Sequence, residues 1–74
     1  MKISVDVYTK DVTAATAVFQ SAIEAGSTDV TIRSNEDYET KEFEYVNLMF
    51  EVDHTSDVLA QLDAGPFVKD YNDL

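Results

Sequence analysis

The feature that most constrains the fold is a set of apolar residues at alternate positions in the second half of the chain. Its members are Val46, Leu48, Phe50 and Val52. This period of two is typical of a β-strand with one buried face. The same pattern recurs near the N-terminus, where Ile3, Val5 and Val7 alternate with Lys2, Ser4, Asp6 and Tyr8. A shorter alternation that includes Val30 and Ile32 predicts a further strand.

Two aromatic residues, Phe43 and Tyr45, have the opposite parity to the apolar residues that follow them. A register shift of one residue exchanges the two faces of a strand. We therefore expect a bulge or a two-sided aromatic strand near Tyr45. The polar stretch 34–37 separates this strand from the preceding one and indicates a hairpin.

After Asp11 the apolar period changes from two to that of a helix. The residues that fall at helical spacing are Val12, Ala15, Phe19, Ala22 and Ile23. Thr9 or Asp11 can cap the start of this helix. Gly26 is expected to end it, because glycine adopts a positive φ without a side-chain clash.

A second, shorter helix is predicted after the central strand. The stretch 53–56 offers several N-caps, and Val58, Leu59 and Leu62 then line one side. Gly65 and Pro66 stop this helix. Residues 67–71 are expected to form a weak final strand, since proline is tolerated at the start of a strand.

The order of elements, β-α-β-β-α-β, predicts an α+β fold of the ferredoxin-like type. In this split βαβ arrangement, two right-handed crossovers place both helices on one face of a four-stranded antiparallel sheet. The other face of the sheet is expected to be open. With 74 residues, the chain is predicted to form a single small acidic domain over residues 1–74.

In its order of elements the chain resembles small ligand-binding domains of the ACT type. The resemblance includes the apolar-rich helix that ends at Gly26 and the return from Leu62 to Val68. Those domains usually carry a glycine in the loop after the first strand, where this chain has Tyr8-Thr9-Lys10-Asp11. The resemblance implies a regulatory or assembly domain that dimerises or binds a small ligand through its sheet.

The net charge is −10, and it is distributed unevenly. Residues 1–35 carry four acidic and three basic residues, whereas residues 36–74 carry eleven acidic and two basic residues. Charge concentrated in one region in this way affects which partners a protein binds and how soluble it is, rather than how it folds. Nucleic acid and anionic lipid both attract basic patches and repel a protein with a net charge of −10. Direct nucleic-acid or membrane binding is therefore disfavoured. Adaptation to high salt is a further explanation of the charge, although it should affect both halves alike.

Nothing in the sequence indicates export or catalysis. The chain has no cysteine, and its N-terminus lacks a long apolar segment, so a cytoplasmic location is expected. Asp53, His54 and Asp57 lack the spacing of a metal loop and are expected to serve helix capping. The glycines occur singly, as Gly26 and Gly65, which excludes a glycine-rich phosphate loop. We therefore expect no enzyme, no cofactor and no metal.

The candidate site is the acidic stretch across the predicted hairpin. Its expected partner-binding residues are Glu36, Asp37, Tyr38, Glu39, Glu42, Glu44 and Tyr45. On an extended strand, Glu42 and Glu44 would lie about 6.6 to 6.8 Å apart on one face, a spacing comparable to that of backbone phosphates. Such a ridge could occupy the basic groove of a DNA- or RNA-binding protein. The alternative is a solvated hairpin whose charges keep it soluble.

The sequence thus favours a non-enzymatic acidic module that inhibits a nucleic-acid-binding protein by mimicry. Small phage-encoded proteins act in this way against host enzymes and defence complexes, in the host cytoplasm. The tyrosines of the hairpin could anchor such an interface or pack in the core, and Phe43 is expected in the core. The alternative function is the ACT-like domain described above, as a possible homodimer.

Overall fold

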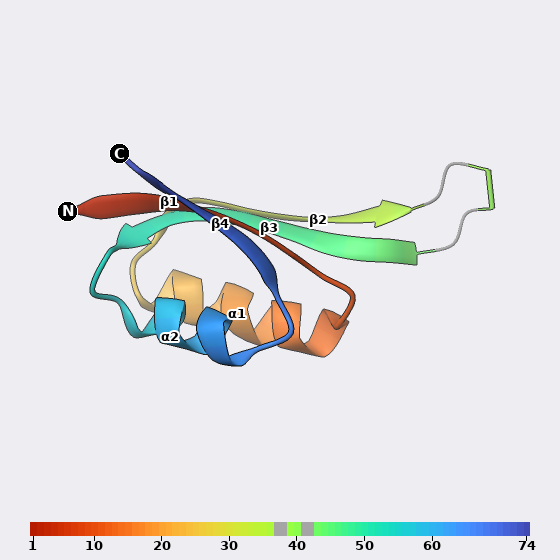
Figure 1. The fold of residues 1–74 in the computed structure, drawn as a ribbon, viewed down its shortest axis with the longest axis horizontal. Helices are drawn as coiled ribbons and strands as arrows, with labels where there is room; N and C mark the ends of the chain where they lie inside the picture. The colour runs from red at the N-terminus through yellow and green to blue at the C-terminus, as the bar shows by residue number, and fades with distance from the viewer. Residues whose placement is uncertain (37–38, 41–42) are drawn as a thin grey trace.

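Four strands and two helices follow one another in the predicted order in the computed structural model, which describes residues 1–36, 39–40 and 43–74. The elements are β1 (Lys2–Thr9), α1 (Val12–Glu24), β2 (Thr28–Glu36), β3 (Phe43–Asp53), α2 (Asp57–Ala64) and β4 (Val68–Asp73). Both helices cover the same face of the sheet (Figure 1). The prediction of an α+β fold with a four-stranded antiparallel sheet and two helices is confirmed.

The strands lie in the order β2-β3-β1-β4, with every neighbouring pair antiparallel. β1 and β3 are therefore central, and β2 and β4 form the edges. Val5 of β1 lies opposite Phe50 of β3 on one side and Tyr71 of β4 on the other. Because directly opposed residues share a face, this register sets which side chains meet the helices.

The core lies between the helices and the strand residues of one parity. Its buried members are Ile3, Val5, Val7, Val18, Ala22, Leu48, Phe50, Val52, Val58 and Leu62. The alternations predicted for β1 and β3 are thus confirmed. In β2 the pattern is much weaker, because this edge strand extends beyond the helices and leaves Ile32 40% exposed.

The buried stripe of α1 differs from the predicted one. Ala15, Val18 and Ala22 are buried, whereas Val12 and Ile23 are each 53% exposed. At about 100° per residue, Val12 and Ile23 lie roughly 90° or more around the axis from the centre of the stripe. The helix therefore presents small residues to the sheet, with Phe19 partly buried beside them.

Both ends of α1 are capped by the residues that the sequence indicates. Asp11 is the N-cap, and its Oδ1 accepts a hydrogen bond from the Ala14 N–H at 2.9 Å. The Thr9 hydroxyl oxygen accepts from the Asp11 N–H at 3.0 Å, so both candidate residues contribute. Gly26 has a φ of 77°, and the Ser27 N–H donates back to the Ala22 carbonyl. This is the Schellman arrangement that ends many helices.

The β2–β3 hairpin projects past the rest of the sheet and past the helices (Figure 1). β1 pairs with β3 only from Val46 to Asp53, so the first residues of β3 pair with β2 alone. The predicted irregularity near Tyr45 is present as a register shift between Asn35 and Glu36. The molecule is consequently elongated, with principal extents of 42 × 21 × 18 Å.

Candidate functional site

The hairpin carries the acidic residues that the sequence singled out. Glu36 ends β2, Glu39 lies in the turn and Glu44 lies in β3, and all three are exposed. The predicted site residues Asp37, Tyr38 and Glu42 lie outside the described residues. The carboxylate row of Glu42 and Glu44 therefore stays a prediction.

Glu44 lies at the register shift of the hairpin, between the Glu36–Phe43 and Asn35–Tyr45 pairs. Alternation along β3 therefore does not assign it to a face; it lies beyond the part of β3 that pairs with β1 and is exposed. Glu36 pairs with Phe43, which brings Glu36 and Glu44 to neighbouring positions on the two strands. Glu36 and Glu44 thus occupy neighbouring backbone positions in the hairpin, next to the Asn35–Tyr45 pair.

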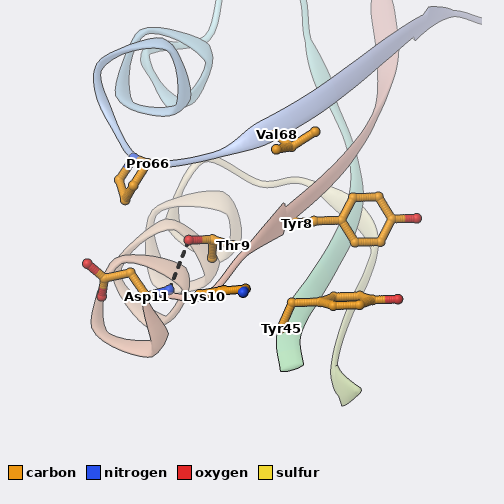
Figure 2. Close-up of a pocket in the computed structure, with 7 residues that line it drawn as sticks. All are labelled: Tyr8, Thr9, Lys10, Asp11, Tyr45, Pro66 and Val68. Atoms are coloured by element: carbon orange, nitrogen blue, oxygen red, sulfur yellow. Dashed lines mark hydrogen bonds between the residues drawn. The ribbon is translucent and has the colours of Figure 1, made fainter. Parts of the chain in front are cut away.

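Tyr45 takes part in an aromatic pair on the open face of the sheet. Its ring meets that of Tyr8 edge to face, with centroids 5.2 Å apart and an interplanar angle of 75°. The two rings lie next to each other with their hydroxyl groups pointing outward (Figure 2). Tyr8 lies directly opposite Asn47 of β3 and Val68 of β4, so three strands contribute to this surface.

A pocket of about 640 Å³ opens beside the two tyrosines. Its lining residues are Tyr8, Thr9, Lys10, Asp11, Tyr45, Pro66 and Val68 (Figure 2). They come from the end of β1, the β1–α1 loop, the start of β3, the α2–β4 connection and the start of β4. This pocket was not predicted from the sequence, although Tyr8 is an aromatic residue at an outward-facing position of an alternating strand and could have indicated it.

Residues around the pocket hold its walls in place. The hydrogen bonds of Thr9 and Asp11 described above fix the β1–α1 loop. β4 is tied to α2 through Asp63, whose Oδ1 lies 3.3 Å from Lys69 Nζ and accepts from the Tyr71 hydroxyl at 3.3 Å. Burial and the Asp63 carboxylate raise the pKa of Tyr71 to about 12. A tyrosine hydroxyl is already protonated at neutral pH, and the raised pKa keeps that of Tyr71 able to donate to Asp63 at alkaline pH as well.

A chain of polar side chains crosses the open face next to the tyrosines. Asn47 is only 2% exposed, and its Nδ2 donates to Asp6 Oδ1 at 2.7 Å and to the Val7 carbonyl at 3.1 Å. Its Oδ1 accepts from Arg33 Nε at 3.2 Å. A buried amide with its groups satisfied fixes the relative positions of β1, β2 and β3.

The open face also carries acidic residues outside the hairpin. Asp6 lies directly opposite Asp70 of β4. In β3, the pKa of Glu51 is raised above its usual value by a hydrogen bond with Asp29, by burial and by the negative charge of Asp29. The positive charge of Lys2 lowers it in part. This second acidic region was not predicted from the sequence.

The loop between β3 and α2 forms a structural turn. Asp53 Oδ1 accepts from the Thr55 N–H at 2.9 Å and from Thr55 Oγ1 at 2.6 Å. His54 Nδ1 lies 3.1 Å from the Met1 carbonyl oxygen, and Ser56 caps α2. Across residues 1–36, 39–40 and 43–74, no three His, Cys, Asp or Glu side chains are arranged to hold a metal ion.

We expect Thr55→Val to raise the pKa of Asp53. Hydrogen bonds from the Thr55 hydroxyl and backbone N–H lower this pKa to about 2, and the variant removes the first of them. Because the pKa is below its unfolded value, ionised Asp53 stabilises the fold above about pH 4, and this contribution is lost as the pH falls towards 2. An NMR titration of the Asp53 carboxyl carbon measures the change. Thr13→Val on the exposed surface of α1 should leave the Asp53 titration unaltered, and an unshifted Asp53 in Thr55→Val would contradict the assignment.

Comparison with protein-family models finds no matching family, and no curated protein matches the sequence significantly. Among the helices in the described part of the chain, none is long and apolar enough to cross a membrane.

Proposed function

We propose that the protein is a non-enzymatic acidic binding module that occupies the basic groove of a DNA- or RNA-binding protein in place of nucleic acid. The observation that carries the proposal is the hairpin: it projects beyond the sheet and helices and exposes Glu36, Glu39 and Glu44 (Figure 1). Such a module would act in the cytoplasm, as phage-encoded inhibitors of host or defence proteins do.

The proposed scaffold is of the ferredoxin-like type, with a split βαβ arrangement. Support comes from the strand order, in which β3 separates β1 from β2 and β1 separates β3 from β4. Each helix then connects two parallel, non-adjacent strands. This scaffold leaves the hairpin free to extend because neither helix has to cover it.

The mechanism is electrostatic substitution. Carboxylates accept charge-assisted hydrogen bonds from arginine and lysine, as phosphate oxygens do. A field concentrated at one end of an elongated molecule also steers its encounter with a basic groove and raises the association rate. Binding of this kind weakens steeply as salt increases.

Charge reversal in the hairpin tests the proposal. The wild-type protein, immobilised at low salt, should retain a nucleic-acid-binding protein from a lysate and release it when duplex DNA or RNA is added. The variant Glu36→Lys/Glu44→Lys should lower the association rate with that protein about tenfold or more, since charges set the on-rate. Surface plasmon resonance at several salt concentrations gives the rate.

The matched control is Glu24→Lys/Asp73→Lys, which changes the net charge by the same amount away from the hairpin, at the ends of α1 and β4. Its association rate should stay within about threefold of wild type, because screened charges act over roughly 10 Å at 0.1 M salt. If the association rate falls equally in the two variants, net charge alone explains the loss and the hairpin is not the binding site. Retention that nucleic acid does not reverse would reject mimicry.

A second candidate function is supported by the open face. The pocket beside Tyr8 and Tyr45 suits an ACT-like domain that binds a small ligand or a second copy through its sheet. Sedimentation velocity tests the self-associating form of this function, since a stable dimer would bury this face.

A further inference from the structure

The pocket lies where the acidic hairpin leaves the sheet. Tyr45 belongs to both, because it lines the pocket and sits in the part of β3 that pairs with β2 alone. Its neighbour Glu44 is one of the exposed hairpin carboxylates. A partner that contacts Glu44 therefore comes within one residue of the pocket along β3.

The walls of the pocket are unusually apolar for exposed surface. Val68 is 73% exposed and lies directly opposite Tyr8, which is 37% exposed. Pro66 is also exposed and lines the same hollow. Exposed apolar side chains that gather around a concave surface mark an interaction site, and the volume of about 640 Å³ falls in the range of binding pockets.

Charges around the pocket indicate what can occupy it. Lys10 and Asp11 both line the hollow, so their opposite charges offset each other and the lining favours neither a cation nor an anion. Acidic residues lie just outside: Asp6 and Asp70 face each other two positions along from the Tyr8 and Val68 pair. The arrangement suits an apolar group in the pocket with basic groups on either side.

We propose that this pocket anchors an aromatic or large aliphatic side chain of the partner, the nucleic-acid-binding protein whose basic residues the hairpin engages. The inference rests on the proposed function and makes it more specific: the partner carries an exposed apolar residue flanked by arginine or lysine. Buried aromatic anchors surrounded by a polar rim supply most of the binding energy in protein interfaces.

The two parts of the surface have different kinetic roles. The hairpin charges accelerate association, whereas the apolar anchor slows dissociation. The hydrogen bonds of Thr9, Asp11 and Asn47 hold the walls before binding, so little ordering entropy is lost when the anchor enters.

Two synthetic peptides stand in for the partner and test the anchor directly. Both are acetylated and amidated heptapeptides with two arginines at each end; one has Gly-Trp-Gly at its centre and the other Gly-Ala-Gly. In ¹⁵N–¹H NMR titrations at low salt, the tryptophan peptide should bind about tenfold more tightly than the alanine peptide. The chemical-shift changes that the tryptophan peptide causes and the alanine peptide does not should fall on the backbone amides of Tyr8, Lys10, Tyr45 and Val68.

Variants separate the anchor from the hairpin. Val68→Asp should abolish the preference for tryptophan, and this exposed edge position tolerates the change without unfolding. Ile32→Asp, at another exposed apolar position, should keep the preference. Glu36→Lys/Glu44→Lys should weaken both peptides while leaving their ratio unchanged.

Each outcome bears on one part of the proposal. Equal affinities for the two peptides, or tryptophan-dependent shifts away from the pocket, would overturn the anchor and leave the hairpin standing. If the tryptophan peptide binds more tightly but Glu36→Lys/Glu44→Lys weakens neither peptide, the pocket is a binding site and the proposed function of the hairpin is wrong. Peptide-independent, concentration-dependent shifts at Tyr8 and Val68 would assign the pocket to a second copy of the chain and overturn the anchor.

Discussion

Replacing Phe50 by alanine should remove a large share of the stability of the protein at 25 °C. Phe50 is 2% exposed, lies in the central strand β3 and packs with Val5, which is fully buried. Truncating a buried phenylalanine to alanine costs about 3–5 kcal/mol, because apolar area is lost and a cavity remains. At about 0.05–0.15 kcal/mol per residue, a domain of this length has a total stability of only roughly 4–11 kcal/mol.

Urea unfolding followed by circular dichroism measures this loss. The control is Ile32→Ala, which removes an apolar side chain that is 40% exposed on the edge strand β2. It should cost less than Phe50→Ala, roughly 1–2 kcal/mol, since a large part of this side chain stays in water after folding. A Phe50→Ala midpoint as close to wild type as that of the control would contradict the assigned core.

The strands were predictable because their burial follows a local rule. In β3, Val46, Leu48 and Phe50 occupy alternate positions, and all three are buried. A pleated strand imposes this period wherever one face is covered. In α1 the rule is less sharp, because apolar residues surround more than half of the helix. Packing against the sheet then selects Val18, while Ile23 stays exposed.

The pocket could not be predicted because it depends on strand order. Tyr8 and Val68 are far apart in the sequence, and they meet because β4 pairs with β1 at the edge of the sheet. Period-two reasoning places each residue on a face but does not say which strand lies beside it. The acidic hairpin, by contrast, was visible in the sequence, since its charges are contiguous in the chain.

Asn47 shows a different limit of sequence reasoning. It lies between two buried apolar residues of β3, so alternation assigns it to the open face and predicts exposure. It is nevertheless 2% exposed, and its amide hydrogen-bonds Asp6, Val7 and Arg33. Two of these partners belong to β1 and one to β2, so the burial arises only after the strands have paired.

Asn47→Asp should be strongly destabilising at pH 7 and much less so in acid. The substitution removes the NH₂ that donates to Asp6 and to the Val7 carbonyl, and it places two carboxylates within hydrogen-bond distance. An uncompensated buried charge costs about 3–5 kcal/mol, of which the Arg33 contact offsets a part. Burial and the charge of Asp6 raise the folded pKa of the new carboxyl above its unfolded value.

The sign of the pH dependence follows from this raised pKa. The folded state binds the proton more tightly than the unfolded state, so stability increases as the pH falls through the folded pKa. The protonated carboxyl can again donate, to Asp6 or to the Val7 carbonyl, which restores one of the lost hydrogen bonds. Urea unfolding at several pH values between 4 and 8 should show the variant approaching wild type on the acid side.

Asn35→Asp is the matched control, since Asn35 is half-buried on β2 and lies opposite Tyr45. It introduces the same charge on the same face, so it accounts for any effect of net charge on the unfolding curve. Its loss of stability should be small and nearly independent of pH, because water still reaches the side chain. If both variants lose the same stability across the pH range, the buried Asn47 amide does not hold the three strands together. The pocket wall behind Tyr8 would then not be fixed by this amide before a partner binds.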